Sequence, residues 1–90
     1  MEKIDLHKKV QHISCRRWFN PREGNTYHTA TLHYPDGSAV KSEIQYGYGE
    51  QCLQTAYDMM QIKPYRGTLG LREDYGISYD IADVARKRDL

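Results

Sequence analysis

The sequence lacks most features of secreted and membrane-bound proteins. Its two cysteines, Cys15 and Cys52, are too few for the disulfide framework of a small secreted domain, and we expect two buried, reduced thiols. No segment approaches the roughly 20 apolar residues that cross a bilayer. The charged start of the chain is not typical of a signal peptide. These absences predict a cytoplasmic protein without membrane contact.

Net charge and chain length narrow the class of protein further. Thirteen Lys and Arg stand against twelve Asp and Glu, so a net charge of +1 gives no chain-wide attraction to nucleic acid. Ninety residues predict a single domain over 1–90, with residues 1–9 and 85–90 expected to be flexible. Eight tyrosines are the main compositional excess.

Residues 34–37, Tyr-Pro-Asp-Gly, are typical of a hairpin turn. Proline and aspartate suit its central positions, and glycine accepts a left-handed conformation. The turn predicts a hairpin of residues 26–34 with 38–46, because the alternation of side chains agrees with it. The predicted pairs are Leu32 with Val40, Ala30 with Ser42, His28 with Ile44 and Tyr27 with Gln45.

A second hairpin is predicted before the first one. Residues 20–25, Asn-Pro-Arg-Glu-Gly-Asn, are rich in turn formers. Folding about them turns the same residues of strand 26–34 inward as the other hairpin does, which supports a three-stranded meander. The predicted pairs are Trp18 with Tyr27, Arg16 with Thr29, Cys15 with Ala30 and Ile13 with Leu32.

The remaining chain predicts a helix over 50–63, a loop over 64–74 and an edge strand over 75–84. Apolar residues recur at helical spacing in the first segment, Pro64 ends it, and the last segment alternates. The fold class is therefore α+β: a three-stranded antiparallel meander, one helix packed on one face and a further C-terminal edge strand. The expected core is Ile13, Cys15, Ala30, Leu32, Val40, Ile44, Tyr46, Leu53, Ala56, Tyr57, Met60, Ile77 and Ile81.

We call the sheet face opposite the helix the second face, and we expect it to be uncovered. Its predicted binding residues are Arg16, Trp18, Tyr27, Thr29, His33 and Lys41. Trp, Tyr and Arg dominate protein interfaces, whereas aromatic rings beside cations also suit single-stranded nucleic acid. A third interpretation is that Trp18 and Tyr27 only stabilise the hairpin by stacking on each other.

The turn Tyr46–Gln51 is a secondary candidate site, with His28, Tyr46 and Tyr48. Its glycines could present backbone N–H groups to an anion at a helix N-terminus. Its spacing matches neither the dinucleotide-binding nor the P-loop motif. The favoured interpretation is structural, with tyrosines filling a corner and His28 as a hydrogen-bonded core residue.

Catalysis, metals and cofactors have little support in the sequence. No serine or cysteine is visibly paired with a base, and His28 and His33 point to opposite faces of a strand. We therefore expect no catalytic residues, no metal and no cofactor. A small-anion or enzymatic role at Tyr46–Gln51 stays an alternative.

Three sequence segments and the C-terminal stretch carry a resemblance to other proteins. The segments are Arg16-Arg17-Trp18-Phe19, Gly24-Asn25-Thr26-Tyr27-His28 and Tyr46-Gly47-Tyr48-Gly49-Glu50-Gln51 with Gln54-Thr55-Ala56, and the stretch is residues 83–90. Over most of 13–90 the chain resembles small uncharacterised proteins of bacteriophages, prophages and mobile elements. The resemblance implies life inside a prokaryotic host cell and brings no activity or site residues.

The leading hypothesis is a non-enzymatic phage-type protein that binds a host protein or protein complex. By analogy with other small phage proteins, inhibition of a host defence complex such as a CRISPR effector is one such role. The alternative is a single-stranded nucleic-acid-binding module on the same face. Homo-oligomerisation through the second face or the edge strand is compatible with these two hypotheses and with the small-anion or enzymatic alternative.

Overall fold

The computed structural model describes residues 9–90, so the expected flexibility of residues 1–8 lies outside the described residues. Strands β1 (His12–Asn20) and β2 (Asn25–His33) form the first hairpin. Their register joins Trp18 to Tyr27 and confirms every pair predicted for this hairpin. Gly24 closes the turn at φ +69°, a left-handed conformation that glycine adopts without strain.

The third strand of the meander is split in two, which corrects the single strand predicted over 38–46. Strand β3 (Ala39–Lys41) pairs with β2 in the predicted register, whereas β4 (Gln45–Tyr46) pairs one residue out of it. His28 therefore lies opposite Gln45 rather than Ile44, and Tyr27 lies opposite Tyr46 rather than Gln45.

The side chain of Ser42 accounts for this break. The Ser42 N–H donates to the Ala30 carbonyl at 2.8 Å, as a ladder residue would. The Ala30 N–H, however, donates to Ser42 Oγ at 3.0 Å instead of to a main-chain oxygen. One extra residue then enters the strand, which is the geometry of a β-bulge.

Helix α1 (Gln51–Met60) packs on β1 and β2 with Leu53 and Ala56 buried. It ends earlier than the predicted residue 63, because Gln61 takes a left-handed conformation with φ 58°.

The predicted loop over 64–74 is wrong, because most of it is helical. Helix α2 (Gly67–Gly70) continues into a π-helical turn (Leu71–Tyr75). Buried Leu71 anchors this segment, and the Tyr57 hydroxyl donates to the Gly67 carbonyl at 2.8 Å.

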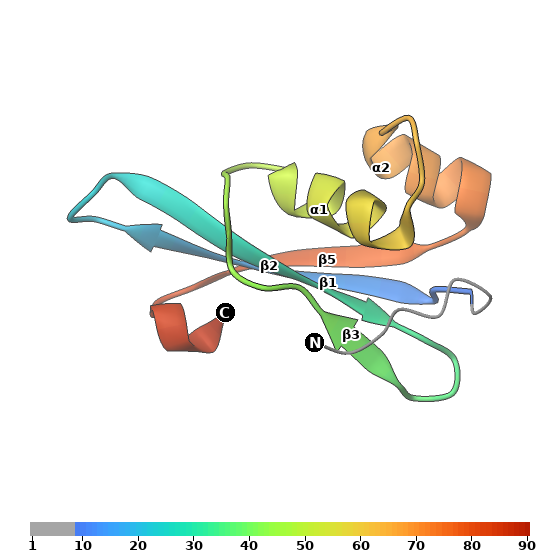
Figure 1. Cartoon of the computed structure of the whole chain (residues 1–90), viewed down its shortest axis with the longest axis horizontal. Coiled ribbons are helices and arrows are strands. Elements are labelled where there is room, and N and C mark those ends of the chain that lie inside the picture. Colours follow the sequence, from blue (N-terminus) through green and yellow to red (C-terminus); the bar gives the residue numbers. More distant parts are fainter. Residues whose placement is uncertain (1–8) are drawn as a thin grey trace.

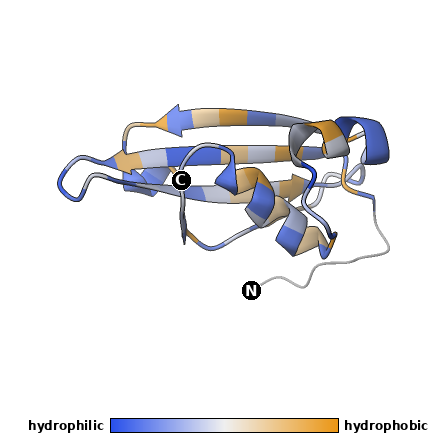
Figure 2. Ribbon diagram, turned by 90° about the horizontal axis from the view of Figure 1, so that it is seen from above, coloured by the Kyte–Doolittle hydropathy of each residue, from blue (hydrophilic) through white to orange (hydrophobic). Residues whose placement is uncertain are grey.

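The last strand, β5 (Ser78–Val84), lies parallel to β1 at one edge of the sheet. The strand order is β3-β2-β1-β5 with β4 also on β2, so the sheet is mixed and has more strands than predicted. Figure 1 shows α1 and α2 on the same side of this sheet. Figure 2 shows hydrophobic and hydrophilic residues alternating along the strands.

The core lies between α1 and the sheet. It contains most of the predicted residues together with Cys52 and Leu71. Two predicted core residues are wrong: Ile44 is 44% exposed and Tyr46 is 60% exposed. Both follow the bulge, whose one-residue shift moves their side chains to the face opposite α1.

Part of the second face is covered, which corrects the expectation that the whole face is uncovered. A short 3-10 helix (Lys87–Asp89) lies on the side of the sheet opposite α1 (Figure 1). Leu90 beyond it is buried, and the Lys41 ammonium donates to the Leu90 main-chain oxygen. The flexibility predicted for residues 85–90 is a property of their motion, which these contacts do not test, so it stays a prediction.

Candidate functional site

An aromatic ladder crosses one end of the second face. It consists of Trp18 from β1, Tyr27 from β2 and Tyr46 from β4. The Trp18 and Tyr27 rings lie 5.9 Å apart and are nearly parallel, with 27° between their planes. The Tyr27 and Tyr46 rings lie 5.8 Å apart at 53°. Three strands thus present one continuous row of rings.

A groove of about 420 Å³ follows this ladder, and we call it the aromatic groove. The residues that line it are Trp18, Asn20, Glu23, Tyr27, Ile44, Tyr46 and Lys87. Glu23 accepts a hydrogen bond from the Tyr27 hydroxyl at 3.2 Å. The groove therefore combines an apolar floor with groups of both charge signs.

The sequence predicted two of the three rings, Trp18 and Tyr27, on this face and placed Tyr46 in the core. Trp18 and Tyr27 were predicted to pair on this face, and they do. Tyr46 and Ile44 were expected in the core, but the one-residue bulge brings them to the groove. The signal that could have located the bulge is Ser42, a side chain able to replace a backbone partner.

Phe19 and Tyr48 are two further aromatic side chains that are exposed, and they lie outside the groove lining. Phe19, next to Trp18 in β1, is 56% exposed, and Tyr48, which follows β4, is 71% exposed. Figure 1 shows the end of the β1–β2 hairpin reaching beyond α1, so that helix does not cover it. Because successive side chains of a strand point to opposite faces, Phe19 does not extend the aromatic groove on the second face.

The centre of the second face is used within the chain itself. Thr29 is 2% exposed, so it cannot reach a partner as predicted. The Lys41 ammonium is bonded to the Leu90 main-chain oxygen. Thr29 is therefore buried within the fold, and Lys41 belongs to the packing of the C-terminal segment.

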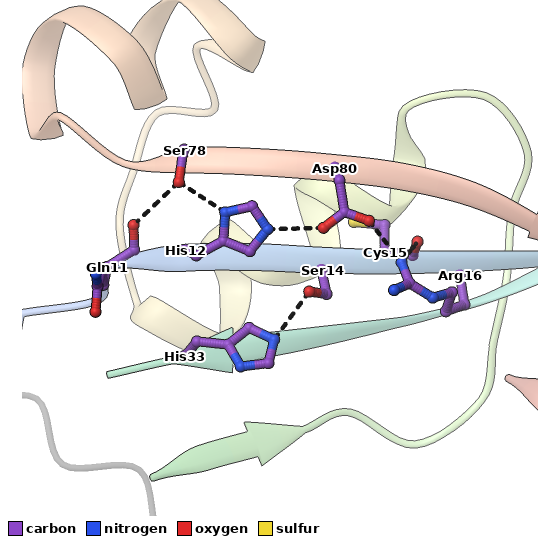
Figure 3. Close-up of polar contacts among 8 residues, drawn as sticks. All are labelled: Gln11, His12, Ser14, Cys15, Arg16, His33, Ser78 and Asp80. Atoms are coloured by element: carbon purple, nitrogen blue, oxygen red, sulfur yellow. Dashed lines mark hydrogen bonds and ion pairs between the residues drawn. The ribbon is translucent and has the colours of Figure 1, made fainter. Parts of the chain in front are cut away.

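A polar cluster occupies the other end of the second face (Figure 3). His12 Nε2 lies 2.7 Å from Asp80 Oδ1, and His12 Nδ1 lies 2.6 Å from Ser78 Oγ. Arg16 Nη1 donates to Asp80 Oδ2 at 2.7 Å. His33 Nε2 lies 2.9 Å from Ser14 Oγ, and the His33 ring lies 5.8 Å from the ring of His12.

The cluster joins neighbouring strands. The hydrogen bond with His12 holds the pKa of Asp80 below its ordinary value, and the Arg16 guanidinium adds to this effect. The carboxylate is therefore ionised and accepts from both β1 side chains. Arg16 and His33, predicted as binding residues, here tie β1 to β5 and β2. The parallel pairing of β5 with β1, which sequence patterns do not specify, creates this arrangement.

The secondary candidate at Tyr46–Gln51 is not brought together as one site. His28 is buried and bonded through both ring nitrogens, to the Gly47 carbonyl at 3.1 Å and to Thr55 Oγ1 at 2.7 Å. Tyr46 faces the aromatic groove and Tyr48 is exposed. The favoured interpretation of His28 as a hydrogen-bonded core residue agrees with this geometry.

Metal-binding clusters and membrane-spanning helices are absent from residues 9–90. Within that range, no group of three or more His, Cys, Asp or Glu side chains is placed to hold a metal ion. No helix in the described part of the chain is long and apolar enough to span a bilayer.

Comparison of the chain with protein-family models, with curated proteins and with solved structures gives no match.

Proposed function

We propose that this chain is a non-enzymatic binding protein whose aromatic groove holds a partner protein. The observation that carries the proposal is the ladder of Trp18, Tyr27 and Tyr46, which lines a groove on the face of the sheet opposite α1. Large rings of this kind supply most of the binding energy in protein interfaces, because they bury much area at little cost in conformational entropy.

The charges around the groove favour protein over nucleic acid as the partner. A strand of phosphates needs several free cations. Two cations of the second face are already engaged, since Arg16 pairs with Asp80 and Lys41 bonds to Leu90. The groove lining combines Lys87 with the carboxylate of Glu23, which would repel a phosphate.

The resemblance to phage and mobile-element proteins supports a narrower form of the proposal. The partner is then a protein of a prokaryotic host and the place of action is the host cytoplasm. A defence complex such as a CRISPR effector is the first candidate to test.

Affinity capture from a prokaryotic host lysate tests the proposal. The bait proteins are the wild type, Trp18→Ala and the control Tyr79→Ala, which removes an exposed ring from β5 outside the groove. Loss of a central aromatic residue costs about 2 kcal/mol or more of binding energy, or about 30-fold in affinity. The wild type and the control should capture the same protein, and Trp18→Ala should lose it while keeping its circular dichroism spectrum.

Two results would contradict the proposal. One is equal capture by the wild type and by folded Trp18→Ala. The other is binding of short single-stranded oligonucleotides that weakens steeply with salt, combined with no specific protein capture at low salt. That second result would identify the groove as a nucleic-acid site.

A further inference from the structure

The aromatic groove carries a carboxylate beside its rings. Neighbouring rings of the row Trp18, Tyr27 and Tyr46 lie 5.9 Å and 5.8 Å apart. Glu23, from the turn between β1 and β2, belongs to the same lining. Its Oε2 accepts a hydrogen bond from the Tyr27 hydroxyl at 3.2 Å, which holds the carboxylate next to the rings. Aromatic rings and a positioned negative charge thus share one groove.

Both parts of this arrangement attract a cation. The face of an aromatic ring is electron-rich and draws a guanidinium or an ammonium group, and tryptophan does so most strongly. The carboxylate of Glu23 can pair with the same group. An anionic side chain would be disfavoured by the ring faces and by Glu23 alike. The groove therefore favours a positively charged side chain of the partner.

Arginine suits the groove better than lysine does. A guanidinium is planar and weakly hydrated, so it can stack on rings and donate two hydrogen bonds to a carboxylate, whereas an ammonium is compact and strongly hydrated. The Trp18 and Tyr27 rings are only 27° from parallel, which gives a planar group two surfaces of similar orientation. The volume of about 420 Å³ leaves room for such a side chain.

Lys87 adds a positive charge to the same lining, from the short C-terminal 3-10 helix. It is exposed, so solvent and salt weaken its repulsion of a second cation without removing it. Glu23 and Lys87 should therefore affect a bound arginine in opposite directions. Loss of the negative charge weakens binding, and loss of the positive charge strengthens it. A groove that acts through packing alone would show no such opposition.

We propose that the aromatic groove holds an arginine side chain of the partner protein, stacked on the rings and paired with Glu23. The inference rests on the proposed function, because the arginine belongs to the protein that the groove binds. It adds the chemistry by which the partner is recognised.

Selection from a library of short random peptides tests the inference. The baits are the full chain as wild type, Trp18→Ala, Glu23→Gln and the control Glu73→Gln, which removes an exposed carboxylate outside the groove. The wild type and the control should enrich peptides with arginine at one fixed position. Glu23→Gln keeps an acceptor for the Tyr27 hydroxyl but lacks the charge, so it should lose that preference.

Replacement of that arginine by citrulline in the best peptide isolates the charge, because citrulline is a neutral side chain of nearly the same shape. The change should weaken binding to the wild type about fivefold or more, measured by Trp18 emission. Glu23→Gln should weaken binding of the arginine peptide about two- to fivefold, and Lys87→Gln should strengthen it by a similar factor. Neither variant should change binding of the citrulline peptide to the same degree.

The results separate this inference from the proposed function. Selection of peptides without a cation by the wild type, and their loss with Trp18→Ala, would overturn the arginine site and leave the groove as a protein-binding site. Equal binding of the arginine and citrulline peptides would have the same meaning. Enrichment of no peptide by the wild type would also overturn the arginine site, while lysate capture would still decide the proposed function.

Discussion

His28 is a buried side chain whose two ring nitrogens are both hydrogen-bonded while the ring is neutral. The Gly47 carbonyl can only accept, so Nδ1 carries the proton, and Nε2 accepts from the Thr55 hydroxyl. Both ring nitrogens are thus used by the neutral imidazole. A second proton on Nε2 would reverse the bond with the Thr55 hydroxyl and would place a charge inside the core, which burial disfavours.

This arrangement predicts a pH dependence of stability. Burial lowers the pKa of His28 from its ordinary value of 6.5. The unfolded chain then binds more protons once the pH falls below about 6.5, so the free energy of unfolding is full above that pH and declines toward the folded pKa. Urea unfolding between about pH 7.5 and 5 should show this decline, and His28→Gln should flatten it. Equal slopes in both proteins would contradict the assignment.

Gly70 is predicted to be required for a close approach. A Cβ atom built there would lie 2.5 Å from Tyr57 Oη and 2.6 Å from Arg66 Cβ. Gly70→Ala should therefore lower the free energy of unfolding by about 1–3 kcal/mol. The neighbouring Leu69→Ala, at a 54% exposed position, should change it by less than about 0.5 kcal/mol. Denaturant unfolding measures both, and a neutral Gly70→Ala would refute the packing argument.

At the scale of elements, turn residues and the alternation of side chains predicted the pairing of strands that are neighbours in the sequence. The β1–β2 register follows from the turn at 20–25 and from alternation, and the structure confirms it. The β2–β4 register does not, because Ser42 Oγ takes the place of a backbone acceptor. The replacement of one hydrogen bond leaves no periodic signal in the sequence, yet it shifts the pairing of the residues that follow in the strand by one position.

Long-range packing determined the elements that sequence patterns missed. The helical segment 67–75 contains two glycines near its start, so its propensity is poor, and buried Leu71 and the bond from Tyr57 hold it in place. The alternation of β5 predicted a strand but not its parallel partner β1. The charged tail gave no sign that Leu90 would be buried.

The packing of the C-terminal segment carries its own prediction. Leu90 is buried and its main-chain oxygen is bonded by Lys41, so Leu90→Ala should lower the free energy of unfolding by about 2 kcal/mol. Because Lys87 lines the aromatic groove, the change should also shift the emission of Trp18. Arg88→Ala, at an exposed position of the same segment, serves as the control. Equal stability of both variants in thermal unfolding would show that the segment does not pack on the sheet.

At the scale of the whole molecule, the second face divides into three parts with different roles. The polar cluster around Asp80 joins strands, the C-terminal segment covers the centre, and the aromatic groove remains accessible. The sequence predicted the face and its Trp18–Tyr27 pair. It did not predict which side chains of this face are bonded within the chain, because their partners lie in β5 and in the C-terminal segment.

Trp18 makes the central claim directly measurable, because it is the one tryptophan of the chain and lines the groove. The measurement is its emission during titration with the protein that the wild type captures. We predict a saturable change whose midpoint varies little between about 50 and 200 mM salt. Binding of that protein without any change in Trp18 emission would contradict the account, as would a response to oligonucleotides alone that weakens about 1,000-fold over the same salt range.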